Sequence, residues 1–579
     1  MKRCPQCNRV ETDDALVFCR IDGTALISDS GSFTGEAGTV RFNSAPVASE
    51  IETSVLPQAI IDAGITRPTA PTTVLPAQHA QENTRPLSKP KRRKAIVAVA
   101  ALIAVVLIAG AYLYWPRGKK AAAIESIAVI PFVNESGNAD VEYLSDGMTE
   151  TLISSLSQLP NLNVRPRSSV FRYKGKDTNP QTIAKELNVQ AILNGRVVQR
   201  GQDLSLFVEL IDVALDKVVW SQQYNRKQAD LVTLQTEIAR DVSSRLKSKL
   251  SGEDEAKITK TYTTNPEAYQ LYLKGNYYRT KFTEEGYTKA LEYYRQAIEI
   301  DPNYALAFTG IAYAYNTASD WYLPPNEVMP KVKAAALKAL ERDNTLAEAH
   351  ILLGVTAFWY EWDWAACERE LKRAIELEPN NAEAHHQYGF YLAAMGRIDQ
   401  AIPEMELARG LAPLDLQLNS DVAEVYNFAG RFDQAIEQAR KTVEMDQNYW
   451  FSHLILGLAY ERKGQFPEAI PAVEKAHSLD NNPGITGYLG YVYAAAGKKA
   501  EAQKVLDELK VLSTQRYVPA YNVAFIYAGL NDKDKAFEWL NKGYEAHSGL
   551  ALMKVETVFD NLRPDPRYKK MLKRLNLPE

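Results

Sequence analysis

The feature that most constrains this chain is a segmental repeat in its C-terminal half. A small residue recurs there, each time at the end of a short run such as LYLKG, ILLG or GYLG. Eight such positions follow one another at intervals of 35, 44, 35, 34, 34, 33 and 34 residues: Gly275, Gly310, Gly354, Gly389, Ala423, Gly457, Gly490 and Ala524. Self-similarity at one period predicts stacked units, each of which buries its apolar face against the next.

Other residue types recur in register with these small residues. A tyrosine lies three residues after six of them, an alanine lies twelve residues after five, and Pro302, Pro379 and Pro413 close three units. A small side chain lets two helices cross closely, the ring fills the gap to the next helix, and proline ends the second helix. This pattern resembles the tetratricopeptide repeat (TPR), whose period is 34 residues. The resemblance implies an all-α TPR solenoid of about eight units over 265–550, with a capping helix over 551–579.

Two features of the repeat segment depart from the pattern. The second unit carries ten extra residues, including TASDWYLPPNE, which we expect to lengthen a loop between helices. Cys367 stands where other units have alanine, if one residue is inserted before it, so we interpret it as a small packing residue. The aromatic run at 358–364 is interpreted as packing between helices rather than a ligand site.

A stack of helix pairs leaves a concave face, formed by the first helix of each unit, that suits an extended peptide or a partner's helix. In TPR proteins the groove-facing positions lie one residue after the small residue and three before it. The resemblance therefore implies a partner-binding groove with these residues: Glu383, His386, Phe390, Ser420, Glu424, Asn427, Leu454 and Tyr491. For each of them the alternative is an ordinary surface or core residue.

Residues 124–252 switch between strand and helix periodicity. We expect strands over 127–132, 162–166, 191–199, 204–213 and 217–224, and helices over 146–159, 180–187 and 230–250. The order βαβαβββα predicts a compact α/β or α+β domain. The phrases EYLSDGMTETLISSLSQLPNLNVRPRSSVFRYKGK and LIDVALDKVVWSQQY resemble the amino-terminal domain of TolB as it occurs in bacterial proteins. That resemblance implies an α/β domain with a protein-contact or structural role.

A single apolar run lies between the N-terminal part and this domain. Residues 95–115 contain 21 residues without a charge, about 31 Å of helix, enough for a hydrocarbon core of about 30 Å. Five basic residues precede the run and three follow it, which favours a cytoplasmic N-terminus. Residues 28–94, rich in Ser, Thr, Pro and Ala, are predicted to be a disordered linker. We expect a single-pass protein of the bacterial inner membrane with its C-terminal domains outside.

The first 27 residues carry three of the four cysteines. Cys4, Cys7, Cys19 and Asp22 have the spacing C-x2-C-x11-C-x2-D, and two such knuckles turn their ligands toward one tetrahedral ion. FCRIDGTAL resembles a bacterial zinc-ribbon variant in which Asp takes the fourth place. We therefore predict a structural zinc ribbon over 1–27, with a free CxxC or a thioredoxin-like redox pair as the alternatives.

Composition and missing motifs limit the function classes. The net charge of −4 argues against nucleic-acid binding through a dominant basic surface. GxxxxGK[ST], GxSxG, HExxH and the kinase phrases do not occur, so neither an enzyme nor a small-molecule substrate is expected. The prediction is a multidomain membrane-anchored scaffold that binds proteins or peptides in its TPR groove. The alternative is a transmembrane signalling or transcription-linked regulator with a cytoplasmic zinc-ribbon output module.

Overall fold

The computed structural model describes residues 124–578, apart from 160, 247–250, 282 and 320–322, together with three short strands near the N-terminus. These strands are β1 (Lys2–Arg3), β2 (Val10–Glu11) and β3 (Ile27–Ser28), paired antiparallel in the order β2-β1-β3. They belong to a body separate from Ala111–Glu579, and each is described by itself. The expected zinc ligands Cys4, Cys7, Cys19 and Asp22, the apolar run 95–115 and all but the first residue of the linker lie outside the described residues. None of the helices that are described has the length and apolarity to span a membrane.

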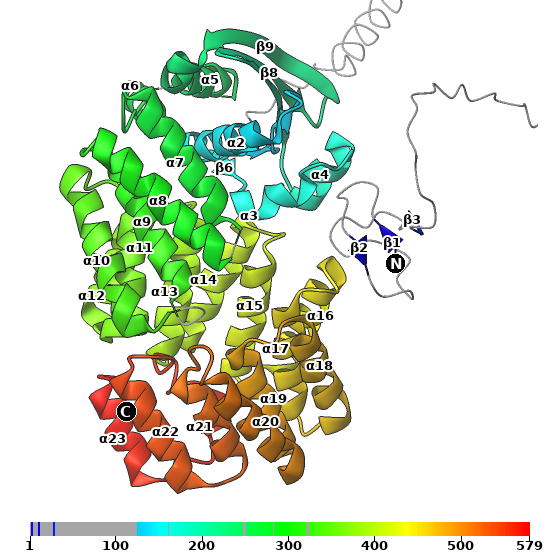
Figure 1. The fold of residues 1–579 in the computed structure, drawn as a ribbon, viewed down its shortest axis with the longest axis vertical. Helices are drawn as coiled ribbons and strands as arrows, with labels where there is room; N and C mark the ends of the chain where they lie inside the picture. The colour runs from blue at the N-terminus through cyan, green and yellow to red at the C-terminus, as the bar shows by residue number, and fades with distance from the viewer. Residues whose placement is uncertain are drawn as a thin grey trace, which may run out of the picture. The chain divides into compact units, whose positions relative to one another are not determined.

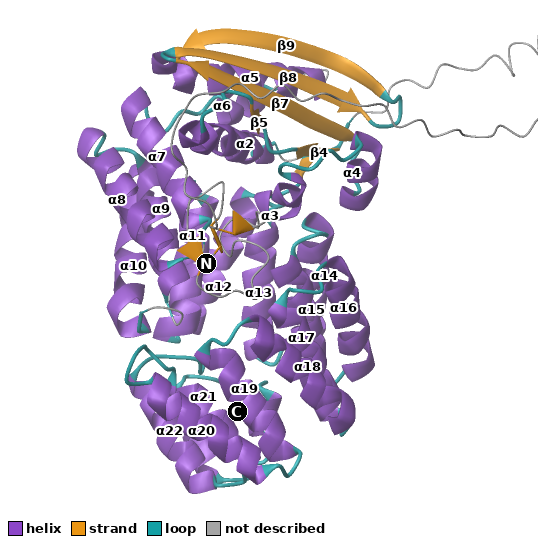
Figure 2. Ribbon diagram, turned by 45° about the vertical axis from the view of Figure 1, so that its right-hand side comes forward, coloured by secondary structure: helices purple, strands orange, loops and turns teal. Residues whose placement is uncertain are grey.

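The α/β domain is a mixed sheet with helices on one face (Figures 1 and 2). Its strands are β4 (Ser126–Val129), β5 (Val133–Asn134), β6 (Asn163–Val164), β7 (Ala191–Arg200), β8 (Asp203–Asp212) and β9 (Lys217–Lys227). They run in the order β6-β4-β7-β8-β9, with β5 beside β7. Strand β4 is parallel to β6 and β7, and β7, β8 and β9 form an antiparallel meander. The mixed sheet therefore confirms an α/β domain.

The helices of this domain are α2 (Glu142–Ser157), α3 (Arg167–Val170), α4 (Pro180–Leu187), α5 (Leu231–Leu246) and α6 (Gly252–Ile258), with 3-10 turns at Ala139–Val141, Phe171–Tyr173 and Gln228–Asp230. Strand β8 alternates buried and half-buried residues, and its buried Leu204, Leu206, Val208 and Leu210 join α2 and α5 in one core. The period of two in this strand is what the sequence pattern predicts.

An all-α repeat array follows, in which the described residues form eight antiparallel helix pairs. The pairs are α7 (Pro266–Arg279) with α8 (Glu284–Ile300), α9 (Ala305–Ala318) with α10 (Pro325–Arg342), α11 (Ala347–Thr356) with α12 (Trp364–Leu377), α13 (Ala382–Ala394) with α14 (Ile398–Leu411), α15 (Leu416–Phe428) with α16 (Phe432–Met445), α17 (Trp450–Arg462) with α18 (Phe466–Leu479), α19 (Pro483–Ala495) with α20 (Lys499–Leu512), and α21 (Ala520–Gly529) with α22 (Lys533–Glu545). The TPR array is thereby confirmed.

The recurring glycines lie where two helices of one unit cross. A Cβ atom on Gly389 would lie 2.6 Å from Met405 Sδ, and one on Gly457 would lie 2.4 Å from a methyl carbon of Val473. Both partners lie on the second helix of the same unit. Real Cβ atoms do not approach other atoms so closely, so the small residue is required by packing.

The third unit takes up its inserted residue as a π-helical turn. Residues Ala357–Glu361 form this turn at the end of α11, and Trp362 follows with φ 53°. A π-turn accommodates one additional residue within a helix. The π-turn brings Cys367 into register with the alanines of other units. The Cys367 side chain, on α12, is buried.

The chain ends in a short helix rather than a long one. The capping helix expected over 551–579 is present only as α23 (Pro566–Arg574). Residues 550–565 instead form turns and a 3-10 turn, Thr557–Phe559. The sequence of this part has no helical period, and Pro564 and Pro566 both lack a backbone donor.

Arg165, only 2% exposed, joins the α/β domain to the repeats. Its guanidinium donates hydrogen bonds to the carbonyls of Leu187 (2.7 Å), Asn188 (2.9 Å), Gly410 (3.0 Å) and Leu411 (2.9 Å). The last two end α14 in the fourth repeat. Helix α2 also crosses α7 so closely that a Cβ on Gly147 would lie 2.8 Å from Leu273. These contacts join the α/β domain to the first and the fourth repeats.

Candidate functional site

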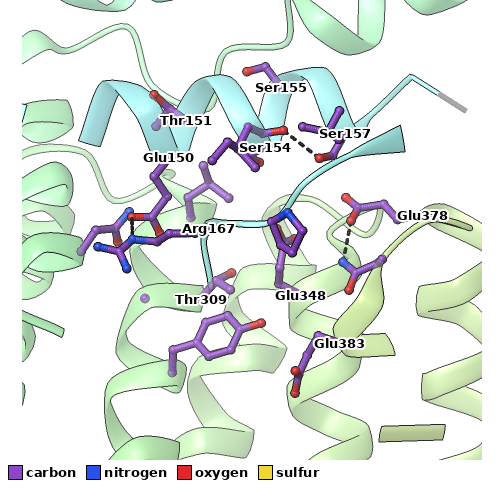
Figure 3. A pocket seen from close by; sticks show the side chains of 18 of the residues that line it. Glu150, Thr151, Ser154, Ser155, Ser157, Arg167, Thr309, Glu348, Glu378 and Glu383 are labelled. Carbon is purple, nitrogen blue, oxygen red and sulfur yellow. Dashed lines mark hydrogen bonds and ion pairs between the residues drawn. The ribbon is translucent and has the colours of Figure 1, made fainter. Parts of the chain in front are cut away.

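A cavity of about 600 Å³ lies where α2 and α3 face the first helices of the repeats (Figure 3). Its walls come from α7, α9, α11 and α13 on the repeat side. The residues used below to describe its chemistry are Glu150, Arg167, Arg279, Glu348, Glu378, Glu383 and His386. A volume between about 300 and 1,000 Å³ is typical of ligand sites in proteins.

The cations of the cavity wall are already paired. Arg167 Nε lies 3.4 Å from one carboxylate oxygen of Glu150, and Arg279 Nη2 lies 3.2 Å from the other. Arg167 Nη2 also donates to Thr280 Oγ1 at 3.3 Å, and its guanidinium lies 3.6 Å from the centre of the Phe171 ring. In the view of Figure 3, Glu150 and Arg167 lie on the left. The three ionic side chains thus connect α2 and α3 to α7 and leave a single excess positive charge.

The opposite wall carries carboxyl groups. Glu378, 8% exposed, accepts hydrogen bonds from Gln158 Nε2 at 2.5 Å and from Asn381 Nδ2 at 2.8 Å. Glu348 on α11 forms no ion pair with any residue that the structure describes. Burial raises the pKa of Glu348, and the nearby carboxyl of Glu378 raises it further. Burial also raises the pKa of Glu378. Lys260 also lines the cavity, but its Nζ pairs with Asp343 Oδ2 at 2.5 Å, so neither Glu348 nor Glu378 has a cation partner among the described residues.

His386 lies between two carboxylates at the edge of the cavity. Its Nε2 is 2.8 Å from Asp421 Oδ2, and its Nδ1 is 3.5 Å from Glu383 Oε2. Burial acts to lower the pKa of His386, but Asp421 and Glu383 outweigh it and raise the pKa well above its ordinary value. His386 on α13 thus contacts Asp421 on α15 and links the two helices.

The other residues expected in the groove divide into two groups. Phe390, Leu454 and Tyr491 lie in a buried apolar cluster with the end of the chain, away from the cavity, and the Tyr491 hydroxyl donates to Glu461 at 3.2 Å. The other three lie on α15: Ser420 Oγ donates to Leu416 O at 2.9 Å, Asn427 is buried, and Glu424 is half-buried. The structure thus brings together Glu383 and His386 at the cavity and does not bring the other six there.

Sequence reasoning missed the cavity residues contributed by the α/β domain. Glu150 and Arg167 carry no motif, and their role depends on how α2 docks against α7. Glu348 lies six residues before Gly354, as Glu383 lies six before Gly389. That shared position in the repeat was the available signal for Glu348. Among the described residues no His, Cys, Asp and Glu side chains gather in a group that could hold a metal ion.

Comparison with known families identifies both folded parts. Residues 122–241 match the second domain of the HilA/YgeH-like transcriptional regulators, and residues 271–304 and 370–402 match tetratricopeptide repeats. The chain is a TPR repeat protein with a HilA/YgeH-like α/β domain before the repeats. The likeness of the α/β segment to the TolB amino-terminal domain stays a prediction.

Relatives are similar over part of their length only. "Putative adenylate cyclase 3" of Rhizobium meliloti (strain 1021) is 28% identical over 236 residues, which cover 40% of each chain. TPR repeat-containing protein YpiA of Bacillus subtilis (strain 168) is 22% identical over 29% of this chain and 40% of that protein. The chain thus spans about two fifths of each of these two relatives. The TPR protein YrrB, solved and described with an unusual peptide-binding site, aligns with a TM-score of 0.25 and 20% identity over 32% of this chain and 92% of that one.

Proposed function

We propose that this protein is a non-enzymatic scaffold that recruits a partner protein by binding a positively charged segment in the cavity beneath α2. The observation that carries the proposal is the wall formed by Glu348 and Glu378, neither of which forms an ion pair with a described residue, while Lys260 in the same lining is already paired with Asp343. A TPR array presents its first helices as a groove for peptides or partner helices. The α/β domain closes one end of that groove and supplies Gln158 to the site.

A lysine or arginine side chain entering the cavity would satisfy both carboxyl groups. Without it, burial favours their neutral forms, and a bound cation favours the ionised forms. A hydrogen-bonded charge pair in a desolvated site contributes strongly to specificity, because a neutral or acidic segment would leave the carboxyl groups unpaired. The ligand class is therefore a segment of a partner protein with a basic side chain.

The test measures binding of two short fluorescein-labelled peptides to the full-length chain by fluorescence anisotropy. One alternates glycine and lysine, and the other alternates glycine and glutamate. We expect the lysine peptide to bind and the double variant Glu348→Gln/Glu378→Gln to weaken it by roughly 30-fold or more. The matched control is Glu341→Gln/Glu376→Gln, which removes the same charge from exposed positions on α10 and α12. Equal binding of both peptides, or equal loss in both double variants, would refute the site.

A regulator of transcription is the second candidate, supported by the match of residues 122–241 to the HilA/YgeH-like transcriptional regulators. In that case binding of a ligand in the cavity would change the transcription of a set of genes. Its test compares transcripts of cells carrying Glu348→Gln/Glu378→Gln with those of cells that carry the exposed control pair. A set of transcripts that changes only in the first strain supports regulation, and identical profiles speak against it.

The membrane anchor and the zinc ribbon are further parts of the proposal that rest on sequence. We propose that residues 95–115 span the bacterial inner membrane with the N-terminus in the cytoplasm. Labelling of a Lys176→Cys variant in intact cells by a membrane-impermeant maleimide tests this, because Lys176 is exposed on the α/β domain. Protection of this cysteine would mean that the span has the opposite orientation, with the α/β domain in the cytoplasm.

We propose that Cys4, Cys7, Cys19 and Asp22 hold one structural zinc ion. Metal analysis of the purified chain should find one equivalent of zinc, which a Cys7→Ser variant should lose. Retention of zinc by that variant would contradict the ligand set.

A further inference from the structure

The segment Leu550–Leu562, which we name the C-terminal segment, has no regular secondary structure beyond one 3-10 turn and yet is almost wholly covered. Only Asn561 in it is exposed, and eight of its residues are buried: Leu550, Ala551, Leu552, Met553, Glu556, Val558, Phe559 and Leu562. Irregular segments normally run over the surface, since their backbone groups need water. Coverage of such a segment therefore requires other hydrogen-bond partners.

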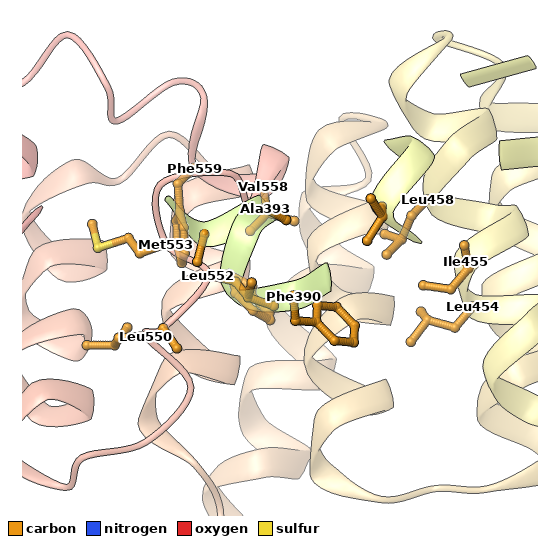
Figure 4. Packing of buried hydrophobic residues seen from close by; sticks show 14 of the residues in the cluster. Phe390, Ala393, Leu454, Ile455, Leu458, Leu550, Leu552, Met553, Val558 and Phe559 are labelled. Carbon is orange, nitrogen blue, oxygen red and sulfur yellow. The ribbon is translucent and has the colours of Figure 1, made fainter. Parts of the chain in front are cut away.

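The surface that covers it is the concave face of the repeats. Figure 4 shows Leu552 of the C-terminal segment beside Phe390 of α13, with Leu454 and Leu458 of α17 on the far side of the same cluster. The Phe559 ring centre lies 5.4 Å from that of Phe525 on α21. Phe390, Leu458 and Phe525 each follow the recurrent small residue by one position, which is the position expected to face a partner.

Hydrogen bonds and an ion pair join this segment to the repeats. Arg462, at the end of α17, donates to the carbonyl of Thr557 at 3.2 Å and forms an ion pair with Asp560. Asn561 Nδ2 donates to the carbonyl of Ala528 in α21 at 2.6 Å. An arginine that holds one carbonyl and one carboxylate is a common means of recognising a peptide.

Other backbone groups of the segment are satisfied from its own flank. Arg563 donates to the carbonyl of Lys554 at 2.6 Å, and the Tyr568 hydroxyl donates to the carbonyl of Met553 at 2.6 Å. Both donors lie after the segment in sequence. The C-terminal segment is therefore held by the residues that follow it as well as by the groove.

The segment is held at both ends by the third repeat. Trp362 stacks on His547, which precedes the segment, with ring centres 4.7 Å apart and planes 4° from parallel. Trp364 Nε1 donates to the carbonyl of Leu575, which follows the segment, at 2.9 Å. In its middle the carboxyl of Glu556 is buried without an ion pair to any described residue, although the backbone N–H of Val558 and the hydroxyl of Tyr488 donate hydrogen bonds to it. A carboxylate buried without a paired cation still costs free energy.

We propose that the C-terminal segment is an internal ligand that closes the groove of α13–α21, and that a partner segment of the same chemistry replaces it. That chemistry is a run of apolar residues followed by a carboxylate that pairs with Arg462. This second site differs from the cation-binding cavity in residues and in charge, since a peptide of residues 548–562 carries Lys554, Glu556 and Asp560 and hence a net charge of −1.

The first test is native-state hydrogen exchange of the full-length chain. We expect amides of 550–562 to exchange through a local opening, at least about tenfold faster than amides of α17 after correction for sequence. In the Asp560→Asn variant their exchange should accelerate further while exchange in α7 and α9 stays unchanged. Exchange of the segment only together with α17 would identify a permanent cap and overturn the proposal.

The second test adds a fluorescein-labelled peptide of residues 548–562 to the full-length chain. The release variant Phe559→Ala/Asp560→Asn keeps the groove residues and should bind this peptide at least about tenfold more tightly than the wild type. Adding Arg462→Gln to that variant should abolish the gain, and Arg440→Gln on α16 is the control. Should the larger change unfold the chain, Asp560→Asn alone provides the comparison. Equal affinity of the wild type and both variants would overturn the proposal, whatever the outcome for lysine peptides.

Discussion

The guanidinium of Arg165 donates to the carbonyl of Leu411 at 2.9 Å, across 246 residues of sequence. The same side chain reaches the carbonyls at the ends of α4 and α14, so one buried cation holds two helix C-termini together. Helix C-termini carry partial negative charge, which a guanidinium complements. The position of the cavity beneath α2 depends on this joint between the α/β domain and the fourth repeat.

Replacing Arg165 by lysine should loosen that joint. Lysine retains the charge but has a single nitrogen, which cannot donate to four carbonyls in a fixed fork. We expect the free energy of unfolding to fall by roughly 2–4 kcal/mol, since buried carbonyls lose charged donors. Urea denaturation followed by circular dichroism measures this, with Arg200→Lys at an exposed position as the control. An effect no larger than the control's would refute the role of Arg165.

Two helical glycines, one at the recurrent position and one outside it, allow a matched pair of substitutions. Gly457→Ala places a methyl group 2.4 Å from Val473 and should lower the free energy of unfolding by about 1–3 kcal/mol. Gly410→Ala, in α14, meets no atom within 4 Å and should raise it by up to about 1 kcal/mol, because alanine favours the helix. Thermal melting of both variants checks the prediction. Changes of the same sign would contradict the packing argument.

His386 should make stability depend on pH. Its pKa is raised in the folded state by Asp421 and Glu383, against the effect of burial, so its contribution is complete below the ordinary histidine value and is lost as pH rises through the raised one. His386→Gln should therefore cost roughly 2–4 kcal/mol near pH 6 and less at alkaline pH. The control is His453→Gln, because His453 Nε2 contacts the carbonyl of Gln447 and has no carboxylate partner among the described residues. A loss independent of pH would show that the charge is not involved.

Glu556 in the C-terminal segment should also make the stability of the folded chain fall as pH rises. Burial raises its pKa to about 7, and the half-buried Glu424, Asp560, Arg462 and Arg563 are the charged groups near it. The folded state then keeps a proton that the unfolded chain releases, so stability is complete below the ordinary carboxyl value and falls as pH rises through about 7. Glu556→Gln cannot ionise and should be more stable than the wild type by roughly 1–3 kcal/mol near pH 8, but not near pH 5. Melting curves at both values decide this.

For the proposed cation-binding cavity, the affinity for a ligand should increase as pH rises. Since the pKa values of Glu348 and Glu378 are raised, binding of a lysine peptide must release protons, and affinity should increase with pH by up to about tenfold per unit for each proton released. Anisotropy titrations between about pH 5.5 and about pH 8.5 measure the slope. An affinity that does not change with pH would mean that the carboxyl groups do not take part.

The sequence pattern within a few residues or one repeat was enough to predict most helices and strands. It was not enough to predict the contacts between domains. The alternation of β8 and the spacing of Gly389 and Gly457 depend on neighbours a few residues or one repeat away, so they can be read from sequence. The partners of Arg165 and Glu150 depend on how two domains dock, and no periodicity encodes that. The C-terminal segment was expected to be a helix because its basic flank is amphipathic, whereas its apolar residues follow the shape of the groove rather than a helical period.

The contact of Trp364 with Leu575 also changes how this repeat array can fold. Most solenoids couple only neighbouring units, so each unit can fold as soon as it leaves the ribosome. Here the third repeat is completed by residues more than two hundred positions later. The apolar groove of α13–α21 therefore stays uncovered until the last part of the chain is synthesised, which raises the contact order of this solenoid. A chain truncated before residue 550 would expose that groove and should aggregate during synthesis.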